Sequence, residues 1–477
     1  MNDSVVIKGG FKEHRQASNN NDKKSPKKIK RTKREFKFVL LALILVIVIP
    51  VATIMRVSDA TSYLTPGSIM DFASITYNIS DRFGQPIYET QQTESGYQEF
   101  INYELFGNLI GHKDRIYNTL LNKNFDLLLP KKINPITGYS EFDVAPRLMK
   151  TTLLPEDSQK KIAELFNDRN GCCFAYNYET GEIYTALSFP SFNPNGDNVE
   201  NLNKCFDGRF IPGSTMKVVT TALAVDQGIK LNKLTFKCNG TYQLPDGSPI
   251  PINCHTPHQG EVDFTTAIGD SCNCYFAQLA ETLDLDKALD TLSKLGFSVN
   301  GKDAKQEVFD NLTKVDSSAK ITTTSNFHDI WSFVGQGRTE VNPIDMAQIA
   351  AAIVNGGKVA QPYLISSVTI PDKNNETVYS ADTEMVELLS SKTANKAAEF
   401  WKSGVDEFYY TKNKLSEKID YAKTGTAQYD GKTDSKLLIG VIESSKTAFY
   451  IVIEHNTDDP SHITIANTLA DLLPKNS

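Results

Sequence analysis

The chain has 477 residues with ordinary aliphatic and aromatic content, enough for about two to three globular units that each have a core. Its formal net charge is −7, but residues 1–37 carry 12 of the 50 basic residues and 4 of the 57 acidic ones. The remainder therefore holds 38 basic and 53 acidic residues, a net charge of −15. An acidic body argues against nucleic acid as a partner, because phosphate binding needs clustered positive charge.

The N-terminal region combines a basic tail with an apolar run. Residues 1–37 are polar and predict a cytoplasmic tail, and residues 38–56 predict one transmembrane helix, because the run Phe38 to Met55 is uncharged and can cross about 30 Å of hydrocarbon. The basic residues that precede it place the N-terminus in the cytoplasm and the rest of the chain outside. A cleaved signal peptide is the alternative, with Ala60 closing a weak cleavage site.

Residues 57–147 predict a small mixed domain. Short alternating runs such as 74–77 are separated by turn signals such as 81–84. Nothing in this stretch carries a catalytic constellation. We expect a pedestal between the membrane and the domain that follows.

Residues 148–477 predict an α+β domain with an antiparallel sheet flanked by helices. An amphipathic helix is expected to start near Pro155, and the apolar runs 172–178 and 182–187 predict a hairpin. A second hairpin, 436–442 with 448–453, and a terminal helix, 463–473, end the domain. The sheet is therefore assembled from distant parts of the chain.

Seven cysteines, an odd number, all follow the apolar run, so at least one is a free thiol unless a partner chain pairs with it. Cys238 and Cys254 could form a disulfide in an oxidising compartment. The run Cys254-His255-x-x-His258 suggests zinc, but no paired C-x-x-C motif accompanies it, so we expect no metal site. Cys272 and the neighbouring Cys274 are predicted to be packing residues.

The first chemical motif is Ser214-Thr-Met-Lys217. Pro212-Gly213 breaks the preceding element, and an apolar helix is predicted from Ser214 to Gln227. A spacing of three places Lys217 one turn from Ser214, where a lysine whose pKa is lowered can accept the hydroxyl proton. Taken alone, the motif is better explained by a capped helix with an exposed lysine, so it needs support from other motifs.

Two further motifs follow in a fixed order. Ser271-Cys272-Asn273 precedes an apolar helical run, and Lys423-Thr424-Gly425-Thr426 lies in a predicted strand. Together with the first motif they match the S-x-x-K, S-x-N and K-T-G set of serine acyltransferases. Chance is a poor explanation for all three.

From about Leu148 to its C-terminus the chain resembles the penicillin-binding D,D-transpeptidase family, of the monofunctional class B type. The resemblance implies that a stem peptide ending in D-Ala-D-Ala lies along the K-T-G strand with its scissile carbonyl at the catalytic serine. The implied catalytic residues are Ser214 as nucleophile, Lys217 as base, Ser271 as proton relay, Asn273 as holder of the donor or of the lysine amine, and Lys423 as positive charge. Thr424, Gly425 and Thr426 would bind substrate, and the backbone N–H groups of Ser214 and Thr426 would form the oxyanion hole.

The resemblance also implies an activity and a set of partners. A bacterial cell-wall enzyme would cross-link peptidoglycan stem peptides without a cofactor and would bind β-lactams covalently. Because residues 57–147 cannot hold a glycosyltransferase domain, the partners implied are a glycan-polymerising membrane protein and division or elongation proteins. The alternatives are a β-lactam sensor, a non-catalytic scaffold, and a D,D-carboxypeptidase or β-lactamase that uses the same site.

Overall fold

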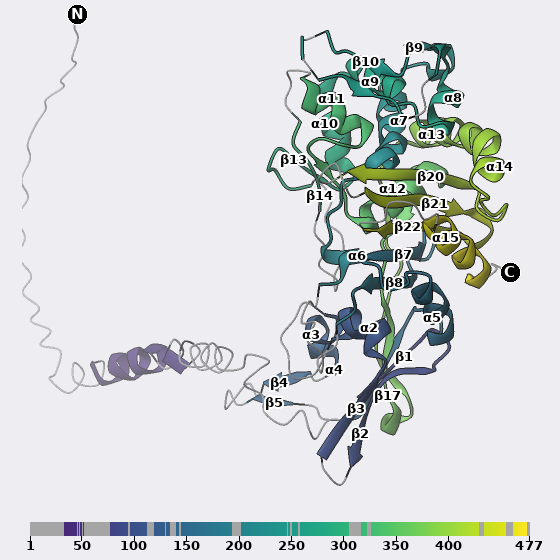
Figure 1. Cartoon of the computed structure of the whole chain (residues 1–477). Coiled ribbons are helices and arrows are strands. Elements are labelled where there is room, and N and C mark those ends of the chain that lie inside the picture. The colour runs from purple at the N-terminus through teal and green to yellow at the C-terminus, as the bar shows by residue number, and fades with distance from the viewer. Residues whose placement is uncertain are drawn as a thin grey trace, which may run out of the picture. The chain divides into compact units, whose positions relative to one another are not determined.

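The computed structural model describes residues 33–44, 46, 48, 49, 51, 77–93, 96–111, 119–128, 130–133, 140–142, 145–192, 202–245, 247, 248, 250–255, 258–304, 316–321, 326–428, 434–454 and 461–474 (Figure 1). The chain divides into two units, residues 1–64 with 133–141 and residues 65–132 with 142–477. The sheets and the candidate site described below belong to the second unit.

Residues 33–44 of the first unit are helical. No helix among the described residues is both long and apolar enough to span a bilayer. Residues 45, 47, 50 and 52–56 of the predicted transmembrane segment lie outside the described residues, so the transmembrane helix stays a prediction.

A six-stranded mixed sheet contains three strands from the predicted pedestal, residues 57–147. Its order is β18 (Glu376–Ser380), β17 (Ile365–Ile370), β6 (Arg147–Thr151), β1 (Tyr77–Ser80), β2 (Pro86–Thr93) and β3 (Gly96–Ile101). Strand β1 runs parallel to β6, and the other pairs are antiparallel. Two of the six strands therefore come from residues far downstream of the predicted pedestal. The helices of this region are α2 (Tyr103–Ile110), α3 (Leu120–Lys123) and α4 (Phe125–Leu128). The short strands β4 (Lys131–Ile133) and β5 (Ser140–Phe142) include residues of the first unit.

A five-stranded antiparallel sheet forms the centre of the catalytic region (Figure 1). Its order is β20 (Tyr421–Gln428), β21 (Asp434–Ile442), β22 (Thr447–Ile453), β7 (Gly171–Asn177) and β8 (Ile183–Phe189). Every residue of β7 and β22 is buried, so helices must cover both faces of the sheet. Helices α5 (Glu156–Glu164), α12 (Pro343–Val354) and α15 (Ser461–Leu472) pack on it. Both predicted hairpins, the terminal helix and the predicted α+β class are confirmed.

Helix α7 (Met216–Asp226) lies inside the helical part of the domain. It packs against α9 (Asn273–Glu281), α11 (Phe327–Val334) and α13 (Ser391–Gly404), and nine of its residues are buried. The other helices here are α6 (Lys204–Asp207), α8 (Phe264–Gly269), α10 (Leu285–Lys294) and α14 (Tyr410–Lys412). The short strands are β9 (Phe236–Cys238), β10 (Thr241–Tyr242), β11 (Ile252–Asn253), β12 (Gly260–Val262), β13 (Phe297–Val299), β14 (Ser317–Ala319), β15 (Thr339–Glu340), β16 (Lys358–Ala360) and β19 (Met385–Glu387). The predicted helix of the first motif is confirmed, although it opens with a 3₁₀ turn, Gly213–Thr215.

Candidate active site

Ser214 lies where the 3₁₀ turn before α7 meets the edge strand β20. Gly213 has φ +54°, and a Cβ at this position would stand 2.6 Å from the carbonyl oxygen of Thr426. Only glycine tolerates both this conformation and this approach. Gly425 on β20 allows the same close approach, because a Cβ at this position would lie 2.9 Å from the carbonyl oxygen of Pro212. These two glycines let the serine turn approach the K-T-G strand closely.

Lys217 connects two of the three motifs. Its side chain is fully buried, and its Nζ donates to Ser214 Oγ at 2.5 Å. The same Nζ contacts Asn273 Oδ1 at 2.7 Å and Ser271 Oγ at 3.2 Å. A lysine within hydrogen-bond distance of a serine hydroxyl can take its proton if the amine is neutral.

The surroundings of Lys217 favour the neutral amine. Burial lowers the pKa of Lys217 well below its ordinary value of 10.5, and the positive charge of Lys423 lowers it further. Burial also lowers the pKa of Lys423, to about 7, while Asp270 acts in the opposite direction. Two buried lysines with depressed pKa values in one site are unusual for a purely structural arrangement.

The second motif forms a tight turn between α8 and α9. Ser271 has φ +60°, a left-handed conformation that a residue with a side chain adopts at a cost. Asn273 is the first residue of α9, and its Nδ2 donates to the carbonyl oxygen of Asn253 at 2.8 Å. This amide thus joins the buried amine of Lys217 to the end of strand β11.

The third motif lies on β20, which among the described residues pairs only with β21. Lys423 is buried, and its Nζ donates to the hydroxyl of Tyr409 at 3.2 Å and to the carbonyl oxygen of Thr424 at 3.0 Å. The Tyr409 hydroxyl also accepts the backbone N–H of Thr424 at 2.9 Å. At the other end of the motif, Gln336 Nε2 donates to the carbonyl oxygen of Thr426 at 3.2 Å. The outer edge of β20 is therefore held in place from both ends.

Comparison with known proteins agrees with this geometry. Residues 171–473, more than half of the chain, match the penicillin binding protein transpeptidase domain. The chain belongs to this family.

Named members of the transpeptidase family are distant relatives of the chain. Peptidoglycan D,D-transpeptidase PbpA of Mycobacterium tuberculosis is 25% identical over 327 residues, 60% of this chain and 62% of the relative. Peptidoglycan D,D-transpeptidase MrdA of Escherichia coli K12 is 23% identical over 286 residues, 53% of this chain and 43% of the relative. The chain thus spans less than two thirds of the length of these relatives.

Solved structures of the transpeptidase family share the fold. The D,D-transpeptidase domain of a peptidoglycan glycosyltransferase from Eggerthella lenta has a TM-score of 0.70 at 20% identity, covering 84% of this chain and 98% of that one. Penicillin-binding protein A of M. tuberculosis, as an imipenem acyl-enzyme, has a TM-score of 0.70 at 20% identity and covers 84% and 100%.

Of the residues predicted from the motifs, the structure brings four into one hydrogen-bonded group: Ser214, Lys217, Ser271 and Asn273. Lys423 makes none of these hydrogen bonds but acts on Lys217 through its charge. Thr424, Gly425 and Thr426 follow one another on the strand that faces the serine turn. Their roles in a reaction stay predictions of the transpeptidase family resemblance.

Sequence reasoning missed the groups that hold the motifs in place. Tyr409 stands in an aromatic run, Phe408-Tyr409-Tyr410, that carries no motif, and it lies in a π-helical turn that single-sequence patterns do not predict. The carbonyl oxygen of Asn253 carries no sequence signal, because every residue has one. Gln336 stands in the run Gly335-Gln336-Gly337, and its contact with Thr426, 90 residues downstream, is not predicted by any local pattern.

Proposed function

We propose that the protein is a membrane-anchored peptidoglycan D,D-transpeptidase that passes a stem peptide from D-Ala-D-Ala to an amine through an acyl-enzyme on Ser214. The single observation that carries this proposal is the buried amine of Lys217, which lies within 2.5 Å of Ser214 Oγ and 3.2 Å of Ser271 Oγ. A buried lysine whose amine contacts two serine hydroxyls is placed to take a proton from one of them and to pass it to the other.

The proposed reaction has two steps, acylation of Ser214 and transfer of the acyl group to an amine, and Lys217 carries a proton in both. Lys217 takes the proton of Ser214 as its oxygen attacks the carbonyl carbon of the penultimate D-Ala, and the N–H groups of Ser214 and Thr426 stabilise the oxyanion. The C–N bond then breaks, and Ser271 relays the proton from Lys217 to the departing D-Ala amine. An amine on a neighbouring strand then attacks the ester carbonyl and loses a proton to Lys217. As the ester C–O bond breaks, Lys217 returns a proton to Ser214 Oγ.

Substrate binding is proposed along the outer edge of β20, where no second strand pairs among the described residues. An extended stem peptide would add to this strand through backbone hydrogen bonds, with its terminal carboxylate at Thr424 and Thr426 near the charge of Lys423. A β-lactam presents a carboxylate and a strained amide in the same relation, so it would acylate Ser214. The imipenem acyl-enzyme of M. tuberculosis penicillin-binding protein A supports this proposal.

Anchoring is proposed from the sequence and from one property of the first unit. Large apolar side chains of its helix are exposed, among them Phe38 at 61% and Leu41 at 56%, which is costly in water and favourable in lipid. We propose that the N-terminus is cytoplasmic, that the catalytic domain is outside, and that the anchor contacts a glycan-polymerising membrane protein and division or elongation proteins. Deleting residues 1–56 should release the protein from the membrane fraction and end co-purification of such a partner, and unchanged recovery of both would contradict the proposal.

The activity is tested with fluorescent penicillin and with a stem-peptide donor plus an amine acceptor. We expect one covalent label per chain, lost in Ser214→Ala and kept in Ser367→Ala, a matched serine on β17. Mass spectrometry should show the amide product with loss of D-Ala. Labelling that survives Ser214→Ala would overturn the nucleophile. A labelled chain that releases no product would instead favour a β-lactam sensor, and release of the hydrolysed donor alone would favour a carboxypeptidase.

A further inference from the structure

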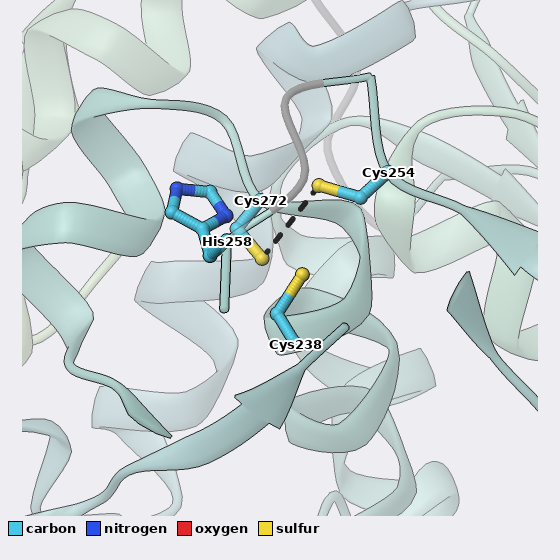
Figure 2. A group of neighbouring side chains, drawn as sticks. All are labelled: Cys238, Cys254, His258 and Cys272. Carbon is cyan, nitrogen blue, oxygen red and sulfur yellow. Dashed lines mark hydrogen bonds between the residues drawn. The ribbon is translucent and has the colours of Figure 1, made fainter. Parts of the chain in front are cut away.

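Three thiols and an imidazole gather beside the second motif (Figure 2). The side chains are those of Cys238, Cys254, His258 and Cys272, and one potential ligand atom from each lies within 4.8 Å of all the others. Cys238 and Cys272 are fully buried, and Cys254 is partly buried. Such a group has no place in the proposed acyl transfer, in which none of the four acts.

The spacing of the sulfurs fits a metal better than a disulfide. Cys254 Sγ and Cys272 Sγ are 3.8 Å apart. Ligands on a tetrahedron with Zn–S bonds of about 2.3 Å are separated by about 3.8 Å, whereas a disulfide needs about 2.05 Å. None of the seven cysteines forms a disulfide in the structure, so the expected alternative of a bridge between Cys238 and Cys254 is not formed here.

His258 adds a second, independent observation. Neither of its ring nitrogens has a hydrogen-bond partner among the described residues, and both are inaccessible to solvent. One ring nitrogen points at the sulfurs and the other points away (Figure 2), and Nε2 lies 3.5 Å from Asp270 Oδ2. A carboxylate behind a histidine is the usual outer partner of an imidazole that ligates a metal through its other nitrogen.

We propose that Cys238, Cys254, His258 and Cys272 bind one Zn²⁺ ion in a closed tetrahedral Cys₃His site. Three soft thiolates and one imidazole are a common ligand set of structural zinc and leave no open position for catalysis. This proposal departs from our expectation of no metal site. That expectation counted only ligands close in sequence, whereas the fourth ligand, Cys272, is brought in from another element.

The site would fix the loop that carries the second motif. Its ligands come from the end of β9, the residue after β11, the loop before β12 and the N-cap of α9. Cys272 stands between Ser271 and Asn273, and Cys254 follows Asn253, whose carbonyl oxygen holds the Asn273 amide. One ion would therefore tie both sides of this hydrogen bond. This positioning role rests on the proposed function, but the metal site itself does not.

The metal site is tested on the full-length protein, purified in detergent under reducing conditions without chelator. We expect about one zinc per chain by elemental analysis, and replacement by Co²⁺ should give thiolate charge-transfer bands and tetrahedral ligand-field bands. His258→Ala and Cys254→Ser should lose the zinc, whereas the matched controls His255→Ala, on an exposed neighbour, and Cys205→Ser, on a distant buried thiol, should keep it. The cobalt spectrum of the unmodified protein needs no variant, so it remains decisive if a variant fails to fold.

Two results would overturn the zinc site. One is a folded protein that stays free of zinc in the presence of added Zn²⁺. The other is a Cys254–Cys272 disulfide found by non-reducing mass spectrometry in the functional protein. Asp270→Asn offers a finer check, because loss of an outer carboxylate should weaken zinc binding by about 10- to 100-fold.

The positioning role is tested by removing zinc from the unmodified protein with a chelator. Labelling by fluorescent penicillin should slow by about tenfold or more and should recover when Zn²⁺ is restored. An unchanged rate without zinc would refute the positioning role. A protein that holds zinc but never labels would instead contradict the proposed function and leave the zinc site standing.

Discussion

The hydrogen-bond partners of the Lys217 amine fall into two groups, which the fold positions in different ways. Ser214 lies one helical turn away on the same chain segment, so the backbone of the 3₁₀ turn and of α7 sets their separation. Ser271 and Asn273 reach the amine from a loop more than fifty residues downstream, because α9 packs against α7. The nucleophile and its base are fixed locally, and the groups that orient the base are fixed by tertiary structure.

This difference predicts where the site is robust and where it is fragile. A helical turn in a buried core keeps its geometry as long as the domain folds. The loop of the second motif depends on a left-handed serine, on one amide-to-carbonyl hydrogen bond and on the cysteine cluster. We therefore expect substitutions in α7 to slow acylation strongly and substitutions in the loop of the second motif to slow it by smaller amounts.

The largest effect is expected from Lys217→Ala. It removes the base, and acylation by fluorescent penicillin should slow by roughly 10² to 10⁴. Lys230→Ala, an exposed lysine just after α7, is the control and should label at the normal rate. The second-order labelling rate is the measurement, and a loss of less than about tenfold would place the base elsewhere.

Asn273→Ala should act through the loop side and cost less. It removes an acceptor from the buried amine of Lys217 and a donor from the Asn253 carbonyl, each worth about 1 to 3 kcal/mol when left unpaired. Acylation should fall by about 10- to 100-fold. Asn253→Ala keeps the backbone carbonyl and should be close to normal, and equal losses in both variants would show that the side chain of Asn253, not its main chain, matters.

The sequence predicted the motif residues on both sides of the Lys217 amine and the local elements that carry them, but it predicted the long-range contacts around them poorly. The S-x-x-K spacing and the two hairpins follow from periodicities of three and two that adjacent residues carry. Strand β17 pairs with β6 although Ile365 and its partner Thr151 are 214 residues apart (365 − 151), a pairing that no local pattern encodes. The cysteine cluster was not predicted for the same reason. Cys272 is 18 residues from Cys254, and it lies within the S-x-N motif, to which we had assigned a catalytic role.

The pH dependence should separate the two buried lysines. Acylation needs neutral Lys217, so the rate at saturation should rise as pH passes upward through its lowered pKa and then level off. Lys423, with a pKa of about 7, loses its charge above about pH 7, so the affinity for a carboxylate-bearing β-lactam should fall there, by about tenfold. Saturation kinetics against pH measures both.

A β-lactam analogue whose carboxylate is esterified is the control for the pH experiment, because its affinity should not follow Lys423. Both lysines also have folded pKa values below the unfolded one, so the unfolded chain binds more protons between these values. The free energy of unfolding should therefore rise as pH increases from about 7 towards the ordinary lysine pKa of 10.5. An affinity that is flat across pH 7 for the carboxylate-bearing compound would remove Lys423 from substrate binding.

The smallest effect is expected from Tyr409→Phe, which tests the third motif. The lost hydroxyl accepts from Lys423 Nζ and from the Thr424 N–H, so its removal should cost about 1 kcal/mol of unfolding free energy. Because the proposed function places the substrate carboxylate at Thr424 and Thr426 near the charge of Lys423, the loss should appear as a severalfold higher KM for the donor with little change in kcat.

Tyr410→Phe is the matched control for Tyr409→Phe. Tyr410 is the next residue, and its hydroxyl donates to the Ile419 carbonyl oxygen instead of touching the K-T-G motif. Both variants should lower the Tm by similar amounts, while only Tyr409→Phe raises KM. If both raise KM equally, the hydroxyl of Tyr409 stabilises the domain without positioning β20, and the outer edge of that strand must be held chiefly by its pairing with β21 and by the close packing of Gly425 on the serine turn.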